Sequence, residues 1–392
     1  MPFSPPPTPP TIVISAQPVP QISSTIVKQS LPLLLTDFPH LPVTPTPTPC
    51  LTPSASPLNH HITPPPLVMS LTANFVLESF SYGKSLVRLL RVVRDSKDST
   101  RHEIVEYTVQ TLLYGPHLET SYTQGDNTLL IATDSQKNAI NYLAKTLPGA
   151  DVLCPEKFAL YIANHFPTKY EHIERCEVSL IAHKWTRLVV GEDQRPHPHS
   201  FIRDGEDKRF VSATANKQGN TVKLTELKGG LKNLCVLKSS GSAFHSFLRD
   251  EFTTLREVED RIFSTSVDVS YTFDVEAAAA GDLDKLLLSS PSSAVSNFEA
   301  IAASVRKHTL DVFATHRSAS VQATLYLMCT RILSDEPTNS SLQSVEYALP
   351  NKHYVPINLD WAKLDNVKEE DAEVFLPQAD PSGLIKAKVS RA

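Results

Sequence analysis

Apolar residues from position 71 onward recur with two periods, and each period predicts one kind of element. Alternating or continuous apolar runs predict strands over 85–93, 104–115, 128–133, 176–190 and 208–214. After the third run the spacing changes, and Ile140, Leu143, Ala144 and Leu147 fall on one helical face. This spacing predicts a helix over 134–147, and the next apolar stretch predicts another over about 155–170.

The second part of the chain follows a similar plan. Residues 232–252 repeat the order of residues 127–147, with an apolar strand, a short polar turn and a helix, which predicts two similar halves divided near residues 215–220. The apolar residues of the helix in the second half would share one face: Phe244, Phe247, Phe252 and Leu255. Further strands are predicted over 264–273, 318–328 and 344–359, with a helix over about 297–315.

Long strands with few helices predict an α+β fold, in which an antiparallel sheet carries its helices on one side. The strand over 318–328 rests on strict alternation, with apolar side chains at Val321, Ala323, Leu325 and Leu327. A sheet of this size exposes its edge strands, so we expect an oligomer that continues the sheet between chains.

The N-terminal part has a different composition. Residues 1–70 contain 19 of the 31 prolines, no glycine, and Lys28 and Asp37 as their charged residues. Because proline removes a backbone donor and fixes φ, we predict a disordered, proline-rich extension over 1–75, with folded domains over 76–216 and 217–392. Strand and turn patterns begin abruptly at Met69, so a chain that starts at Met69 is a second hypothesis.

Charge and composition exclude several functions. The formal net charge of -5 and the pI near 6.3 provide no broad positive field, which excludes nucleic acid as the main ligand. No run of about 18 apolar residues occurs, so we expect no membrane-spanning segment. The five cysteines are widely spaced and form no C-x-x-C pair, which favours a reducing compartment. The glycine motifs of nucleotide-cofactor enzymes and the G-x-S-x-G motif of serine hydrolases are absent.

Some polar residues allow both a structural and a functional interpretation. His197 and His199 could ligate a metal, but no carboxylate or thiolate is spaced to complete the site, so surface or hydrogen-bonded histidines are the alternative. Thr133 and Asp134 stand just before the predicted helix, where they would cap it or bind an anionic ligand.

Two other segments raise the same question. Lys84, at the start of a predicted strand, would by default be solvated. In "LPNKHY", Asn351 and His353 would share one face of an extended segment, which fits an ordinary edge strand as well as a site.

The segment "LCVLKSSGSAFHSFLRDEFTTLREVEDR", residues 234–261, is the most specific pattern in the chain. It resembles the signature of the uricase (urate oxidase) family at Leu234, Lys238, Ser239, Ser240, Ser242, Phe244, Phe247, Phe252, Leu255 and Arg261. The segments "YGK", "ETSYT", "ATDSQKN", "HPHSFIRD", "SASVQAT", "LPNKHY" and "GLIK" also resemble uricase segments and occur in the same order. The resemblance covers nearly everything from Tyr82 onward.

This resemblance implies the tunnelling fold (T-fold), with two tandem domains of antiparallel sheet and helices per chain. It implies a homotetramer with active sites at subunit interfaces. The implied activity, in purine catabolism, is cofactor-free and metal-free oxidation of urate by dioxygen to 5-hydroxyisourate and hydrogen peroxide. The alternatives are another purine or pteridine enzyme on this fold, with zinc held by His197, His199 and a cysteine, and a non-catalytic binding protein.

The resemblance also implies a role for individual residues. Phe244 would stack on the purine, Arg261 and Gln322 would clasp its two edges, and Val321 would offer its backbone N–H. Backbone groups of Thr133 and Asp134 would reach the ligand from the neighbouring subunit.

The remaining implied roles concern proton transfer and dioxygen. Lys84, Thr133 and His353 would form a proton relay, and Asn351 would line, with Thr133, a polar pocket for dioxygen or water. Family members commonly end in a peroxisomal tripeptide of the Ser-Lys-Leu kind, so the resemblance implies a peroxisomal location. The terminal Ser390, Arg391 and Ala392 lack the leucine, which leaves the cytoplasm as the alternative.

Overall fold

The structure is a computed structural model that describes residues 75–276, 283, 287, 297–368, 371–378 and 380–392. By contacts the chain divides into two units, Met1–Ala73 and Asn74–Ala392, and the described residues belong to the second. Except for residue 75, the predicted proline-rich extension lies outside the described residues, as does Met69. Within the described residues, no helix is long and apolar enough to cross a membrane.

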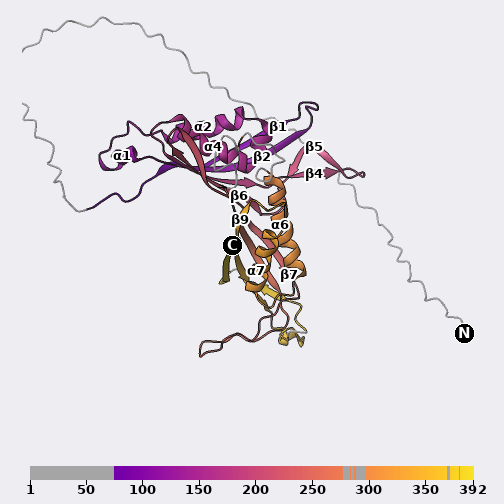
Figure 1. Ribbon diagram of the computed structural model, residues 1–392. Coiled ribbons are helices and arrows are strands. Elements are labelled where there is room, and N and C mark those ends of the chain that lie inside the picture. The colour runs from indigo at the N-terminus through magenta and orange to yellow at the C-terminus, as the bar shows by residue number, and fades with distance from the viewer. Residues whose placement is uncertain (1–74, 277–282, 284–286, 288–296, 369–370, 379) are drawn as a thin grey trace, which may run out of the picture. The chain divides into compact units, whose positions relative to one another are not determined.

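One antiparallel sheet of eight strands forms the frame of this unit (Figure 1). Its spatial order is β1-β2-β3-β6-β7-β8-β9-β12, so β1 and β12 are the two edges. The strands are β1 (Tyr82–Arg94), β2 (His102–Tyr114), β3 (Arg175–His183), β6 (Lys208–Gln218), β7 (Thr221–Lys238), β8 (Phe263–Phe273), β9 (Leu342–Lys352) and β12 (Gly383–Ser390).

Two small hairpins extend this frame. The first pairs β4 (Thr186–Val190) with β5 (Arg195–Ile202), and the second pairs β10 (Tyr354–Pro356) with β11 (Phe375–Pro377). The strand predicted over 176–190 is therefore two strands. The chain leaves the sheet after His183 because Trp185 donates to Glu106 (2.9 Å) and Arg187 donates to the backbone oxygen of His102 (2.6 Å).

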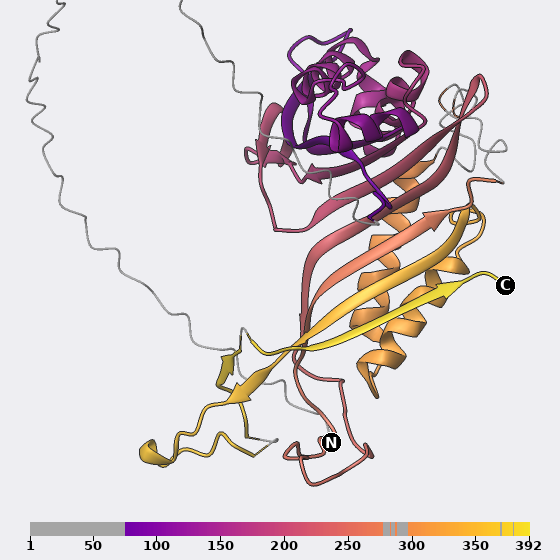
Figure 2. The same cartoon turned by 90° about the vertical axis from the view of Figure 1, so that its left-hand side faces the viewer.

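The helices pack on one face of the sheet, as Figure 2 shows for the two orange helices behind β7, β8, β9 and β12. The helices predicted over 134–147, 155–170 and 297–315 are confirmed as α2 (Thr133–Thr146), α4 (Pro155–Lys169) and α6 (Phe298–Thr315). The other helices with bounds in the described residues are α1 (Glu119–Thr123), α3 (Gly149–Leu153) and α7 (Val321–Leu333), with 3-10 turns at Pro116–Leu118 and Asp360–Ala362.

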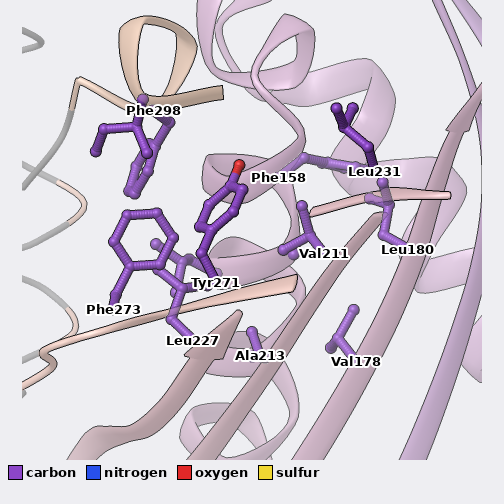
Figure 3. Close-up of a cluster of buried hydrophobic side chains, with 14 of the residues drawn as sticks. Phe158, Val178, Leu180, Val211, Ala213, Leu227, Leu231, Tyr271, Phe273 and Phe298 are labelled. Carbon is purple, nitrogen blue, oxygen red and sulfur yellow. The ribbon is translucent and has the colours of Figure 1, made fainter. Parts of the chain in front are cut away.

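The core is continuous across the middle of the sheet (Figure 3). Strand β7 pairs with β6 on one side and β8 on the other, and Gly229 and Gly230 lie where it passes between them. A Cβ at Gly230 would lie 2.2 Å from the Phe210 ring and 2.2 Å from the Val269 oxygen, so no larger residue fits there. The β6–β7 turn at Gly219 falls at the predicted division, but the two domains over 76–216 and 217–392 stay a prediction because this sheet spans both.

Two of the predicted strands are wrong. Residues 128–132 form a loop, in which the N–H of Leu130 donates to the oxygen of Asn127, and residue 133 already begins α2. Residues 321–328, predicted to alternate as a strand, belong to the helix α7. The same stretch also has an apolar face at helical spacing, formed by Val321, Leu325, Met328 and Ile332. The side chain of Ser320 caps this helix by accepting from the N–H of Ala323 (3.2 Å).

The helix predicted through Phe244, Phe247, Phe252 and Leu255 is also wrong, because this segment has no regular structure. Phe244 and Val258 exchange backbone hydrogen bonds (2.9 and 3.0 Å), which an intrahelical ladder would exclude. A turn follows in which the carboxylate of Asp250 accepts from the N–H of Phe252 (3.0 Å). Figures 1 and 2 show this loop, residues 239–262, extending beyond one end of the sheet.

Candidate active site

The loop between β7 and β8 is closed at its base by one carboxylate. Asp260 accepts hydrogen bonds from the hydroxyl of Ser240 (2.5 Å) and from the backbone N–H groups of Gly241 (2.6 Å) and Ser242 (3.2 Å). Burial alone would raise the pKa of Asp260, but these hydrogen bonds together hold it below its ordinary value of 3.8. The ionised carboxylate therefore fixes the backbone next to Arg261.

Backbone hydrogen bonds join the same loop to the chain before α7. Ala243 donates to the oxygen of Ser318 (2.7 Å), Ser318 donates to the oxygen of Gly241 (2.9 Å), and Arg261 donates to the oxygen of Ser242 (2.8 Å). Residues from three distant parts of the chain are thereby placed together.

Phe244 and Arg261 form the centre of this arrangement. The guanidinium carbon of Arg261 lies 5.2 Å from the centre of the Phe244 ring, and Phe247 stacks on Phe244 with ring centres 4.9 Å apart. The guanidinium of Arg261 makes no hydrogen bond or ion pair with another described residue. Burial lowers its pKa, yet an arginine stays charged in proteins, so this cation has donors available for a ligand.

The start of α7 contributes further donors. The first N–H groups of a helix have no intrahelical partner, and Val321 and Gln322 occupy the first turn. The Gln322 side chain is exposed, whereas that of Val321 is buried. The guanidinium of Arg261, the side-chain amide of Gln322 and the first N–H groups of α7 therefore lie near one another.

Asn351 and His353 lie at the same end of the sheet. Asn351 pairs with Thr265 of β8, and His353 follows one residue after β9, both with partly buried side chains. Lys238, at the end of β7, donates to the backbone oxygen of His316 (2.7 Å), which ties this sheet end to the chain before α7. The structure thus gathers Phe244, Arg261, Val321, Gln322, Asn351 and His353 in one region.

The other predicted residues form a second cluster, on β1 and α2. Lys84 pairs with Thr111 across β1 and β2, and Thr133 and Asp134 begin α2. A hydrogen bond from Lys137 chiefly, and the charge of Lys84 to a smaller extent, lower the pKa of Asp134. Lys84 therefore lies near the start of α2, where its positive charge favours the ionised form of Asp134.

The start of α2 is held against the sheet by buried polar contacts. The N–H of Ile131 donates to the hydroxyl of Tyr82 (2.8 Å), and the hydroxyl of Thr111 donates to the side-chain oxygen of Gln136 (3.0 Å). Thr111 and Gln136 are fully buried. These contacts fix the position of Thr133 relative to Lys84.

The two clusters do not meet within one chain. Lys84 lies on the edge strand β1, whereas Asn351 lies on β9, six strand spacings away in the sheet. At about 4.8 Å per spacing, roughly 29 Å of sheet separates the two strands. A site that uses both clusters therefore needs a second chain.

One large cavity lies away from the predicted site residues. A cavity of about 620 Å³ between the sheet and the helices α4 and α6 is lined by residues such as Ala150, Trp185, Arg209 and Ala302, and by none of the predicted site residues. Its polar groups are largely paired with one another. A smaller cavity of about 360 Å³ lies at the base of the loop between β7 and β8, lined by residues such as Lys238, Ser240, Asp260 and His316.

The metal interpretation of His197 and His199 gains no support. Their ring centres are 4.7 Å apart, but in the part of the chain that the structure describes, the group that could hold a metal is Cys154, Glu156 and Glu299. There the guanidinium of Arg209 already donates to Glu156 (2.8 and 2.9 Å) and to Glu299 (2.6 Å), so a resident cation compensates the two carboxylates.

Comparison with known proteins identifies the family. The family model described as Uricase matches residues 80–214 and 227–386, which is more than half of the chain. The chain belongs to the uricase family. The uricase of Aspergillus flavus is 44% identical over 310 residues, which cover 79% of this chain and 95% of that protein. The uricase of Schizosaccharomyces pombe is 41% identical over 315 residues, which cover 79% and 96%.

Solved structures agree with this uricase assignment. The crystal structure of uricase from Arthrobacter globiformis has a TM-score of 0.67 and 30% identity, and the match covers 81% of this chain and 96% of that one. The predicted α+β T-fold is thereby confirmed.

Some residues that build this candidate site were not predicted from the sequence. Asp260 belongs to the segment 234–261 that resembles the family signature. Because a helix was predicted there, its role in closing the base of a loop was not predicted. Gln136 and Thr111 were unremarkable polar residues, and their pairing depends on the register of α2 against β2. A buried polar residue inside an apolar face, such as Gln136 beside Ile140, is the signal that could have indicated such a contact.

Proposed function

We propose that this chain is a urate oxidase that uses urate, dioxygen and water to form 5-hydroxyisourate and hydrogen peroxide. The observation that carries the proposal is the guanidinium of Arg261, which has no hydrogen bond or ion pair with another described residue and lies beside the ring of Phe244, near the start of α7. Family membership supports the same activity.

Recognition of urate follows from shape and charge. Urate is a planar anion with carbonyl and N–H groups on its edges. A guanidinium fork at Arg261 suits one edge, the side-chain amide of Gln322 suits the other, and Phe244 provides a flat surface for stacking. The N–H of Val321 adds a donor at the positive end of a helix.

Proton transfer prepares the purine for oxidation. Dioxygen is a triplet and reacts slowly with closed-shell molecules, so the substrate must first become electron-rich by losing a proton. We assign this step to Lys84, Thr133 and His353, and assign to Asn351, with Thr133, the pocket that holds dioxygen or water. Two electrons then pass from the purine to dioxygen, which leaves as hydrogen peroxide, and water supplies the oxygen of the new hydroxyl group.

We further propose that the protein assembles as a homotetramer, because the two clusters are far apart in one chain. The edges support sheet continuation: Leu86 and Leu90 on β1 are 78% and 56% exposed, and Leu384 on β12 is 61% exposed. Light scattering should give four times 43.2 kDa. Leu90→Asp should break the assembly and the activity together, while Val189→Asp, at an equally exposed hairpin residue, should preserve both.

One assay tests the activity. Chelator-dialysed protein is mixed with urate, and both the loss of urate ultraviolet absorbance and the production of hydrogen peroxide are followed. Equal rates without added metal are expected. Activity that returns only with zinc would favour the metal-dependent alternative, and urate binding without turnover would favour a binding protein.

For the compartment we propose the peroxisome, on family resemblance. The guanidinium of Arg391 donates to the oxygens of Leu342 (2.8 Å) and Leu333 (2.7 Å) and to Glu336 (2.7 Å), so this arginine is bound to the folded unit. Co-fractionation of the native protein with peroxisomes tests the proposal, and recovery in the cytoplasm would refute it.

A further inference from the structure

A buried hydroxyl without a partner lies beside the proposed dioxygen pocket. Thr265 on β8 is fully buried, and its Oγ1 has no hydrogen-bond partner among the described residues. Buried polar atoms are rarely left unpaired, because each costs the free energy of its lost hydration. Such an atom calls for a partner from outside the chain or for a role in function.

The sheet register places Thr265 directly opposite Asn351. The two residues are a Cα pair between β8 and β9. Side chains of directly opposed residues lie on the same face, with Cβ atoms about 5 Å apart. Thr265 shares this face with the buried residues Val267 and Val269, and Asn351 shares it with Leu349, so both side chains belong to the face covered by the helices.

Neighbouring hydroxyls are all paired within the chain. Ser264 donates to the oxygen of Val236 (3.1 Å), Ser318 donates to the oxygen of Ser320 (3.0 Å), and Thr324 donates to the hydroxyl of Ser318 (2.8 Å). Thr265 is thus an exception in a region where the chain satisfies its hydroxyls. Ser344, another buried and unpaired hydroxyl, lies at the far end of β9.

On the side of β12, the Asn351 side chain has no polar neighbour in the pairing register. Its partner on β12 is Gly383, which has no side chain, and no hydrogen bond joins the Asn351 side chain to another described residue. Thr265 is therefore the polar neighbour in this row of the sheet that could fix the orientation of the carboxamide.

We propose that Thr265 is a positioning residue for Asn351. Its hydroxyl holds the carboxamide, through one bridging water, in the orientation that Asn351 needs to bind dioxygen or water above the purine. This inference rests on the proposed urate oxidase function. The contact acts on dioxygen and leaves the urate clasp, formed by Arg261 and Gln322, unchanged.

Thr265→Val removes the hydroxyl and keeps the branched shape. We expect kcat/KM for dioxygen to fall about tenfold, which is the effect of one lost hydrogen bond, while KM for urate stays within about twofold. The melting temperature should stay close to the wild-type value, because valine keeps the buried branched shape and only one hydrogen bond is lost. Thr265→Ser should restore most of the activity, and Ser344→Ala, which removes the matched hydroxyl at the other end of β9, should leave it unchanged.

A double-mutant cycle with Asn351→Ala decides whether the effect passes through Asn351. If it does, Thr265→Val has little further effect in the Asn351→Ala background. Additive losses, an unaltered rate in Thr265→Val, or dissociation of the oligomer would each overturn the proposal. Wild-type protein that does not oxidise urate would instead refute the proposed function, so the two failures are distinguishable.

Discussion

The guanidinium carbon of Arg261 lies 5.2 Å from the centre of the Phe244 ring, although the two residues belong to opposite ends of one irregular loop. A backbone hydrogen bond brings them together. The N–H of Arg261 donates to the oxygen of Ser242 (2.8 Å), and Ser242 stands two residues before Phe244 in the chain. A flat hydrophobic surface and a planar cation are thereby presented together, which is the combination that an anionic purine requires.

Arg261→Ala should mainly weaken the binding of urate and its unreactive analogues. Loss of a charge-assisted, two-pronged contact is expected to raise the Kd by at least about tenfold. Arg261→Lys keeps the charge and loses the planar fork, so it should recover only part of the affinity. Titration with an analogue measures the effect, and unchanged affinity in Arg261→Ala would contradict the assigned contact.

Lys84→Met should instead reduce turnover, by roughly a hundredfold or more, with a much smaller change in urate affinity. The reason is that Lys84 is assigned to proton transfer and lies near the start of α2. Lys137→Met is the matched control, because Lys137 contacts Asp134 (2.6 Å) but has no place in the relay. Stopped-flow turnover and analogue titration separate the two effects. Equal losses of rate and affinity in Lys84→Met would show that Lys84 only binds the substrate.

Asp260 gives the site a defined sensitivity to acid. Because its pKa is lowered in the folded protein, the ionised carboxylate stabilises the loop fully above its ordinary value of 3.8, and this stabilisation is lost as the pH falls below it. The protection of residues 239–262 from hydrogen exchange, taken relative to the intrinsic exchange rate at each pH, should therefore be unchanged from neutral pH to about pH 4 and fall below that. Asp260→Asn should raise exchange in this loop already at neutral pH. Release of the wild-type loop between pH 5 and pH 7 would show that another group controls it.

The sequence predicts the elements whose pattern allows a single interpretation. The helix over 134–147 has apolar residues at i, i+3, i+4 and i+7, and β1, β2 and β8 combine β-branched and aromatic residues with turn signals at their ends. The interval 321–328 satisfies both periods, and the helix prevails because Ser320 caps it and its apolar face packs on β9.

The candidate site could be predicted only through family resemblance. Phe244 and Arg261 are 17 positions apart in a loop that periodicity describes as a helix, and Asn351 meets Thr265 through sheet register, which single-sequence patterns do not fix. That the hydroxyl of Thr265 has no partner among the described residues likewise cannot be read from the sequence, because it depends on which groups its neighbours bind.

Gly83, next to Lys84, should tolerate no side chain. A Cβ at this position would lie 1.7 Å from the backbone oxygen of Thr111, so Gly83→Ala must push β1 away from β2. We expect a lower melting temperature and a loss of turnover, because Lys84 would move relative to Thr133. Gly383→Ala is the control for stability, since an added Cβ there would meet its nearest atoms at ordinary distances of 3.8 and 3.9 Å. Thermal unfolding of both variants measures the difference, and equal stability of Gly83→Ala and wild type would contradict the close packing of β1 on β2.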